Sequence, residues 1–271
     1  MPKLSVITIN FNDQIGLEKT IQSVLSQTFK DLEYIVIDGG STDGSADVIK
    51  MYAGQIKYWV SEKDNGIYHA QNKGIKAATG TYCLFLNSGD HLVDTTILKN
   101  VFSHNFSEDI VYGDMMIDTG DGKIHYGKHP DKVGFDFMIH TTLWHPVSFI
   151  KRSLFEKYGL YNEDLKIVSD YEFFLKTIIV HNASTKHIPI AIAVFNTAGI
   201  GSSSKYKRLH NQERKLVQEK YFDKKMIAEA KVRMKKQRGP VALVSDWLEQ
   251  YPTIKKAASF LYRGIKKGGG R

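Results

Sequence analysis

The chain has 271 residues, 42% of them hydrophobic, which suffices to bury the core of one large domain with an appendage rather than of two equal domains. Its single cysteine, Cys83, excludes an intramolecular disulfide and a metal cluster built on cysteines. No signal peptide follows Met1, and no apolar run reaches the about 18 residues of a membrane span, so we expect a cytoplasmic protein in a reducing compartment.

The charge is distributed unevenly along the chain. Residues 1–204 hold 18 Lys and Arg against 23 Asp and Glu, a net charge of −5. Residues 205–271 hold 19 Lys and Arg against 6 Asp and Glu, a net charge of +13. We therefore expect a mildly acidic body and a basic tail whose partner is an anionic surface.

Hydrophobic patterns in the first third of the chain predict strands and helices in alternation. Short apolar runs indicate strands at residues 4–9, 34–37, 56–60 and 82–86. Helical stripes indicate helices that end near residue 28, run from about 46 to 52, and run from 68 to 78. Because the strands are apolar throughout, the pattern predicts an α/β fold with a mostly parallel sheet flanked by helices.

The second half of the chain predicts a more mixed structure. Strands are indicated at residues 110–112, 115–117, 124–126, 147–150 and 188–194, with a hairpin turn at Asp121-Gly122. Helices are indicated at residues 152–158 and 171–180. The composition shifts from Ser202 onward, so we place the end of the body at residue 204.

Polar clusters follow the predicted strands of the first half, at residues 8–10, 38–45, 62–66 and 87–90. Ligands bind beyond the carboxyl ends of parallel strands, so the fold would gather these clusters at one rim. The residue types suit a nucleoside diphosphate: Asp38 can accept the imide N–H of uracil, and Thr8 and Asn10 can hydrogen-bond the base or ribose. Asp90 can ligate Mg²⁺ or Mn²⁺. Taken singly, the segment from Asp38 is equally well explained as a capped turn.

Four segments resemble family 2 glycosyltransferases in order and spacing: VITINFN at 6–12, YIVIDGGSTDG at 34–44, NKG with AATG at 72–80, and FLNSGD at 85–90. The likeness covers roughly residues 3 to 200 and is closest to bacterial enzymes that build O-antigens, capsules and exopolysaccharides. It implies a GT-A fold, a UDP-sugar donor, Mn²⁺ or Mg²⁺ as cofactor, and inversion at the anomeric carbon. Carried over by motif, Thr8, Asp38 and Asp64 would bind uridine, and Asp90 would hold the metal.

The metal motif of the chain departs from that of the family. The family usually carries several acids there, often as D-x-D-D, whereas this chain has Asn87-Ser88-Gly89-Asp90. Asn87 can serve as a neutral ligand or as the hydrogen-bond partner of a metal-bound water. Ser88 is predicted to bind the nucleotide-sugar donor. The departure bears on the strength of metal binding and not on its location.

The segment VSDYEFFL at residues 168–175 matches the stretch where this family keeps its general base. An inverting transfer needs one carboxylate to take the proton of the acceptor hydroxyl, and Asp170 is the predicted base. Glu172 lies about 200° further around the helix and points elsewhere. Alternatively, Asp170 or Ser169 only caps the helix, whose N-terminus would lower the pKa of Asp170. His145 is predicted as an acceptor contact.

Apolar residues recur at helical spacing in the basic tail, in one stripe from Phe222 to Met234 and in a second from Trp247 to Ile265. A basic amphipathic helix of this kind is typical of a peripheral protein on the inner face of an anionic cytoplasmic membrane. The alternative is that the helix packs on the body or on a second subunit.

The sequence therefore predicts a glycosyltransferase that moves a sugar from a UDP-sugar to a saccharide acceptor, lipid-linked, in surface polysaccharide biosynthesis. We expect a GT-A catalytic domain at 1–204, with a nucleotide-sugar half at 1–92 and an acceptor half at 93–204, and a basic helical tail at 205–271. Two alternatives stay open: a nucleotide-sugar-binding protein that lost catalysis, and a nucleic-acid-binding protein. The acidic body would repel phosphates, so nucleic acid is not an expected partner.

Overall fold

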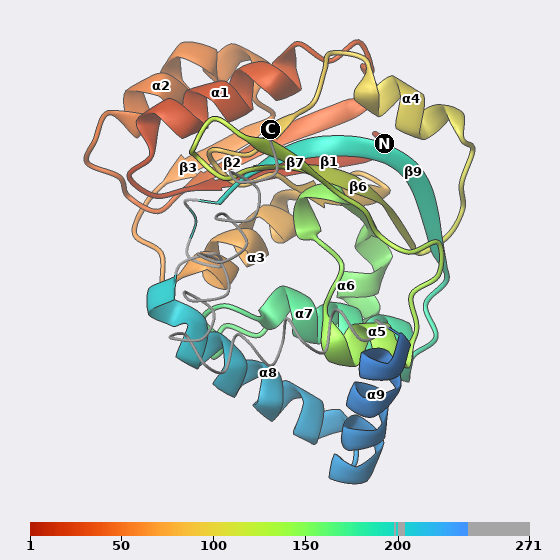
Figure 1. The fold of residues 1–271 in the computed structure, drawn as a ribbon. Coiled ribbons are helices and arrows are strands. Elements are labelled where there is room, and N and C mark those ends of the chain that lie inside the picture. The colour runs from red at the N-terminus through yellow and green to blue at the C-terminus, as the bar shows by residue number, and fades with distance from the viewer. Residues whose placement is uncertain (198, 200–203, 238–271) are drawn as a thin grey trace, which may run out of the picture.

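The computed structural model describes residues 1–197, 199 and 204–237 (Figure 1). Within them, a nine-stranded sheet in the order β3-β2-β1-β4-β8-β6-β9-β5, with β7 paired to β6, lies between two layers of helices. This is the α/β architecture with flanking helices that the sequence predicts.

The first half of the sheet is parallel. Its strands are β1 (Leu4–Asn10), β2 (Leu32–Asp38), β3 (Tyr58–Ser61) and β4 (Tyr82–Phe85). The connecting helices are α1 (Gln14–Leu25), α2 (Ser45–Tyr52), with a 3₁₀ turn at Ala53–Gln55, and α3 (Ile67–Ala77). Strand β1 is buried along its whole length, as expected for an apolar strand that helices cover on both faces.

The second half makes the sheet mixed. Its strands are β5 (His91–Leu92), β6 (Ile110–Asp118), β7 (Ile124–Gly127), β8 (Ser148–Lys151) and β9 (Thr185–Asn196). Its helices are α4 (Ile97–Ser103), α5 (Phe135–His140), α6 (Arg152–Tyr158) and α7 (Ser169–Phe174), which continues as a π-helix at Leu175–Val180. The predicted hairpin is confirmed, but the strands expected at 110–112 and 115–117 form one strand whose register shifts around Asp114.

Alternate residues of each strand face opposite helix layers. Val6 and Tyr34 pack in the core on the side of α1, α2 and α4, whereas Ile7 and Ile35 pack on the side of α3, α6 and α7 (Figure 1). A shift of one residue would exchange these two sets, so burial fixes the register of the strands. The polar residues that follow β1, β2, β3 and β4 are thereby held at one edge of the sheet.

Helices α8 (Lys207–Tyr221) and α9 (Lys224–Gln237) pack on the body. Glu213 of α8 accepts two backbone N–H groups of the segment before α7, at 2.8 and 3.0 Å. Ile227 and Ala230 of α9 pack against Ile139 of α5. The packed body thus extends beyond residue 204, because the helices within residues 207–237 pack on it. The predicted stripe at 247–265 lies outside the described residues.

Across these described ranges, no helix combines the length and the hydrophobicity that a membrane span requires.

Candidate active site

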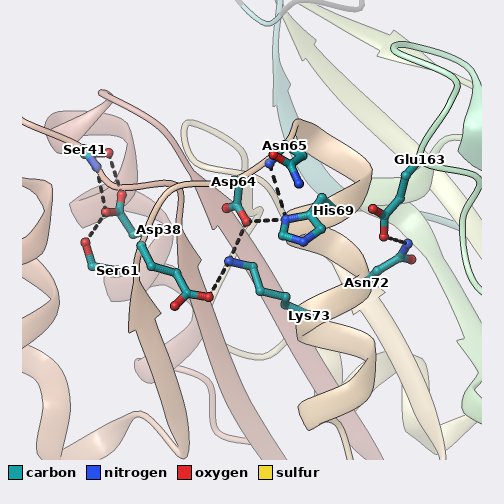
Figure 2. A network of polar contacts seen from close by, with 10 residues as sticks. Asp38, Ser41, Ser61, Asp64, Asn65, His69, Asn72, Lys73 and Glu163 are labelled. Atoms are coloured by element: carbon teal, nitrogen blue, oxygen red, sulfur yellow. Dashed lines mark hydrogen bonds and ion pairs between the residues drawn. The ribbon is translucent and has the colours of Figure 1, made fainter.

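Three polar side chains lie side by side where β1, β2 and β3 end. Asn10 is the register partner of Asp38, which is the register partner of Ser61. The Asp38 carboxylate accepts hydrogen bonds from Asn10 Nδ2 at 2.7 Å and from Ser61 Oγ at 2.6 Å. It also accepts the hydroxyl and the backbone N–H of Ser41, at 2.5 and 3.0 Å (Figure 2). Burial would raise the pKa of Asp38, but these hydrogen bonds outweigh it and hold the pKa below its ordinary value.

Two buried oxygen atoms close to Asp38 have no partner among the described residues: Asn10 Oδ1 and Asp64 Oδ2. Buried polar atoms are rarely left unpaired, so these two oxygens still have capacity to accept a hydrogen bond. Each oxygen of Asp38 already accepts two hydrogen bonds, so Asp38 contacts a ligand only if one of its donors turns away. Beside the saturated Asp38, the acceptors with unused hydrogen-bonding capacity are therefore those of Asn10 and Asp64.

Helix α3 holds the other oxygen of Asp64. Lys73 Nζ lies 2.5 Å and His69 Nδ1 lies 2.9 Å from Asp64 Oδ1, and Lys73 also pairs with Glu62 at 2.9 Å (Figure 2). Burial would lower the pKa of Lys73, but Asp64 and Glu62 outweigh it and raise the pKa. Asp64 is thus anchored through one oxygen and presents the other.

An exposed aromatic ring stands at this part of the rim. Phe11 follows β1 and is 66% exposed. A Cβ built on Gly39 would lie 3.2 Å from the Phe11 ring and 3.4 Å from Asp64 Oδ2, so Gly39 lies between the two. Phe11 is absent from the residues predicted from the sequence, although a large apolar residue directly after a buried strand is the signal that finds it.

Thr8 lies deeper than the other predicted donor-binding residues. Its hydroxyl donates to the Leu86 carbonyl at 2.7 Å and accepts from the Tyr34 hydroxyl at 2.9 Å, and the residue is fully buried. The side chain therefore links β1 to its neighbours within the core, and its contact with a nucleoside stays a prediction.

The turn after β4 carries the predicted metal residues. Asp90 is buried, its Oδ1 accepts the backbone N–H of Asn196 at 2.9 Å, and burial raises the pKa of Asp90 to about 7. Gly89 has a φ of +91°, a left-handed backbone conformation that favours glycine. The half-buried Ser88 donates its backbone N–H to β1 at 3.0 Å, which aligns the turn with the end of β1.

The donor atoms of this turn fit a cation that a diphosphate shares. No three His, Cys, Asp or Glu side chains gather into a metal site within the part of the chain that the structure describes. The turn carries one carboxylate, Asp90, and one carboxamide, Asn87. Mg²⁺ commonly takes one or two carboxylates and completes its shell with water and phosphate oxygens. A nearby cation would also favour the charged form of the buried Asp90.

Asp170, near the start of α7, is held from two sides. Its Oδ1 accepts the Tyr68 hydroxyl at 3.0 Å and the backbone N–H of Tyr171 at 2.9 Å, whereas its Oδ2 faces His145 Nδ1 at 3.4 Å. Burial would raise the pKa of Asp170, but His145 and these donors outweigh it and hold the pKa below its ordinary value. The pKa thus moves in the direction predicted for an acid at a helix start. Tyr68, from α3, is a contact that no sequence motif indicates.

Glu172 has a separate set of partners. Its carboxylate lies 2.7 Å from Lys220 Nζ and 3.0 Å from the Tyr221 hydroxyl, both on α8, and 3.2 Å from Asn162 Nδ2. Glu172 therefore ties α8 to α7, and the prediction that it points away from Asp170 is confirmed.

His145 connects the turn after β4 with α7. It lies on a 3₁₀ turn, His145–Val147, with Nε2 3.0 Å from Asn87 Nδ2 and Nδ1 3.4 Å from Asp170 Oδ2. The structure thus brings Asn87 and Asp170 to one place, next to the strand ends that carry Asn10 and Asp38.

The sequence model described as Glycosyl transferase family 2 matches residues 5–159. The chain belongs to glycosyl transferase family 2. The match runs from β1 to α6 and so includes the strand ends that form the first half of the rim. Membership of this family makes the protein a glycosyltransferase.

Curated relatives of this glycosyltransferase include mycobacterial proteins. An uncharacterized glycosyltransferase of Mycobacterium tuberculosis is 34% identical over 216 residues, which is 74% of this chain and 78% of that one. A PGL/p-HBAD biosynthesis glycosyltransferase of Mycobacterium bovis is 28% identical over 204 residues, which is 73% of this chain and 78% of that one.

Solved glycosyltransferases share the fold. TarS 1–349 of S. aureus with UDP-GlcNAc has a TM-score of 0.61 at 21% identity, over 74% of this chain and 61% of that one. The chain spans 36% of the longer TarS chain. The mannosyltransferase PcManGT of Pyrobaculum calidifontis, with GDP-Man and Mn²⁺, has a TM-score of 0.60 at 16% identity, over 98% of this chain and 82% of that one. At these identities the likeness shows the GT-A fold.

Proposed function

We propose that this glycosyltransferase moves a sugar from a UDP-sugar to a saccharide hydroxyl with inversion at the anomeric carbon. The observation that carries the proposal is that one rim holds three kinds of group. They are unpaired acceptors at Asn10 and Asp64, a carboxylate and carboxamide at Asp90 and Asn87, and an ionised carboxylate at Asp170. The first kind can bind a nucleobase, the second can bind a diphosphate through a cation, and the third can take the proton of an acceptor hydroxyl.

The nucleoside end of the donor is proposed to lie between Phe11 and Asp64. An exposed ring offers a stacking surface, and the unpaired Asp64 Oδ2 and Asn10 Oδ1 can accept a base N–H. Asp38 holds Asn10 and Ser41 in place around this site. The solved structures of TarS with UDP and of PcManGT with GDP-Man support a nucleotide-sugar donor. Uracil and guanine both carry an imide N–H, so a screen of UDP- and GDP-sugars distinguishes them.

The diphosphate end is proposed to lie at the turn after β4. Asp90 and Asn87 would hold Mn²⁺ or Mg²⁺ together with diphosphate oxygens, and the backbone of Ser88 would border the donor. When bound, the cation would neutralise charge on the leaving diphosphate. The PcManGT complex with Mn²⁺ supports this cofactor class.

The acceptor proton is proposed to go to Asp170. The acceptor oxygen forms a bond to the anomeric carbon, while the bond from that carbon to the diphosphate oxygen breaks and UDP leaves with the electron pair. The proton moves from the acceptor hydroxyl to Asp170 Oδ2, the oxygen that Tyr68 and the Tyr171 N–H leave open. One displacement inverts the anomeric carbon and requires no second carboxylate as nucleophile.

The acceptor is proposed to be lipid-linked, with the enzyme on the inner face of an anionic membrane. The exposed side chains of α8 and α9 include Leu216, Met226 and Val232 within a lysine-rich surface. Residues 205–271 carry a net charge of +13. Apolar groups among basic ones are the composition that binds anionic headgroups.

A screen of UDP-, GDP- and dTDP-sugars with Mn²⁺ tests the proposal, with binding followed by calorimetry and turnover by release of the nucleoside diphosphate. We expect binding and turnover with UDP-sugars. Binding without turnover in the presence of saccharide acceptors would favour a nucleotide-sugar-binding protein that lost catalysis. The observation that motivates this alternative is that the metal motif has fewer acids than is usual in the family. Failure to bind any donor would overturn the proposal.

A further inference from the structure

The side chain of His145 contacts both the cation side and the acceptor side of the rim. Its Nε2 lies 3.0 Å from Asn87 Nδ2, and its Nδ1 lies 3.4 Å from Asp170 Oδ2. The side chains of His145 and Asp170 are 19% and 18% exposed, so both can be reached from the rim and both are packed. Pro146 follows within the turn His145–Val147 and restricts the backbone that carries the imidazole.

Asn87 determines which imidazole nitrogen carries the proton. The amide nitrogen of Asn87 can only donate, so the Nε2 that faces it must accept. Gln71 Nε2 lies 3.5 Å from Asn87 Oδ1, which agrees with this orientation of the Asn87 amide. A neutral imidazole that accepts at Nε2 carries its hydrogen on Nδ1, the nitrogen that faces Asp170.

The two oxygens of Asp170 are held differently. Oδ1 accepts the Tyr68 hydroxyl and the backbone N–H of Tyr171. Oδ2 is contacted from His145, at a distance that is long for a hydrogen bond and that a small rotation of the ring would shorten. Hydrogen bonds of catalytic groups are often long before the substrate binds. The imidazole is therefore placed to set the rotation of the carboxylate while a lone pair of Oδ2 stays open for the acceptor proton.

We propose that His145 is a positioning residue for Asp170: its Nδ1–H orients the carboxylate, and its Nε2 links that orientation to Asn87. The inference rests on the proposed function of Asp170 as general base. If the Asn87 oxygen faces a cation, its amide nitrogen faces His145, so an occupied cation site favours the same chain of hydrogen bonds. His145 thus acts on the acceptor through Asp170 rather than by contact.

A double-mutant cycle on kcat tests this dependence. We expect His145→Ala to lower kcat by about 10- to 100-fold, because misplacing a reacting group by about 1 Å costs about that much. In the Asp170→Asn background, we expect the same change to lower kcat by less than about threefold, since residues that act as a unit are not additive. An equal loss in both backgrounds would overturn the proposal. UDP affinity without metal is expected to stay within about twofold of the parent in all variants.

Two conservative variants separate the contacts of His145. The amide nitrogen of asparagine is as many bonds from Cβ as Nδ1, and that of glutamine as many as Nε2. We therefore expect His145→Asn to keep a larger share of kcat than His145→Gln, because the first retains a donor toward Asp170. The reverse order would contradict the proposal. His125→Gln, on the exposed strand β7, is the control for a general loss of a histidine.

The tautomer of His145 gives a readout that does not depend on turnover. ¹⁵N chemical shifts of the imidazole in the full chain are expected to show hydrogen on Nδ1, and Asn87→Ala is expected to shift the ring toward a mixture of tautomers. Hydrogen on Nε2 in the parent protein would overturn the inference. If the parent binds donors and turns none over, the proposed function fails. The tautomer of His145 would still show whether the hydrogen bonds from Asn87 through His145 to Asp170 form as proposed.

Discussion

The four carboxylates of the rim differ in how many of their lone pairs are in use. Asp38 accepts four hydrogen bonds, whereas Asp64 is anchored through Oδ1 and has an unpaired Oδ2. The pKa of Asp90 is raised to about 7 by burial, and that of Asp170 is held low despite burial, by His145 and its hydrogen-bond donors. These environments support the proposed roles of the four residues: organisation of the site by Asp38, contact with the nucleobase by Asp64, cation binding by Asp90 and proton acceptance by Asp170.

Asp64→Asn is expected to weaken UDP binding by about tenfold or more, because hydrogen bonds to charged groups contribute about 1.5–3 kcal/mol. Isothermal titration calorimetry measures the affinity, and thermal melting is expected to stay near that of the parent. Asp38→Asn is expected to lower the melting temperature as well as the affinity, since an amide NH₂ would face donors that now point at a carboxylate. The exposed Asp47→Asn is the control. Parent-like UDP affinity of Asp64→Asn would rule out the base contact.

Asp170→Asn is expected to lower kcat by about 10²–10⁴-fold at unchanged donor affinity, since general-base help is worth about that much. The low pKa of Asp170 keeps the carboxylate ionised above its ordinary pKa of 3.8, so we expect no loss of rate from its protonation at neutral pH. Glu172→Gln is the matched control, expected to keep kcat and to lower the melting temperature through its contacts with α8. If Asp170→Asn retains more than about a tenth of kcat, the base lies elsewhere.

Asp90→Ala is expected to abolish the gain in UDP affinity that Mn²⁺ provides, while the affinity without metal changes little. The reason is that Asp90 is the acidic side chain within the turn Asn87-Ser88-Gly89-Asp90. Calorimetry with and without a chelator measures both affinities. An identical Mn²⁺ dependence in the variant and the parent would exclude Asp90 as a ligand.

At the scale of elements, Glu33 joins β2 to β1 and to the turn before β4. Its buried carboxylate accepts hydrogen bonds from Ser5 Oγ at 2.6 Å, from the Thr79 hydroxyl at 2.8 Å, and from the backbone N–H groups of Thr79 and Gly80 at 2.5 and 3.1 Å. Burial would raise the pKa of Glu33, but these donors outweigh it and lower the pKa below 4.5. Glu33 therefore aligns the strands whose ends carry the donor site.

Glu33→Gln is expected to reduce the free energy of unfolding by about 1–3 kcal/mol at neutral pH, because an amide NH₂ would face buried donors. Since the folded pKa lies below the unfolded one, the stabilisation by Glu33 is present above pH 4.5 and is lost as the pH falls through the folded pKa. Urea unfolding at several pH values measures the difference, which is expected to shrink in acid. The exposed Glu229→Gln is the control, and a loss independent of pH would contradict the ionised state of Glu33.

At the scale of the molecule, α8 and α9 belong to the body. Arg214 lies 3.9 Å from the Tyr171 ring centroid and donates to the Thr141 carbonyl at 3.0 Å, and Gln218 donates to the Tyr171 hydroxyl at 3.0 Å. These contacts brace the helix that carries Asp170. The membrane-binding part of the tail is accordingly proposed to begin at the outward surface of α8 and α9 and to continue into residues 238–271.

Deletion of residues 238–271 is expected to leave the melting temperature and UDP affinity near those of the parent and to weaken binding to anionic vesicles. Each basic residue near such a surface contributes about 1 kcal/mol, so the loss is expected to exceed tenfold. Co-sedimentation with vesicles that contain phosphatidylglycerol measures it, and neutral phosphatidylcholine vesicles are the control. Equal binding of the parent and the truncated protein to anionic vesicles would show that residues 238–271 do not bind the membrane.

The sequence by itself determined most of the strands, their order along the chain and the polar clusters at their ends, because apolar runs and turn residues are local properties. The motif residues Asp38, Asp90 and Asp170 are visible for the same reason. The sequence did not predict the two-residue strand β5. Only the tertiary structure decided that Asp38 is saturated while Asp64 is not, since that depends on the side chains of neighbouring strands and of α3. It also placed Phe11 and Tyr68 at the rim, and it brought His145, which the sequence predicts as an acceptor contact, against Asp170 and Asn87, because such contacts join residues far apart in the chain. The packing of α8 and α9 was decided there too, since an amphipathic stripe is equally suited to a membrane and to a protein core.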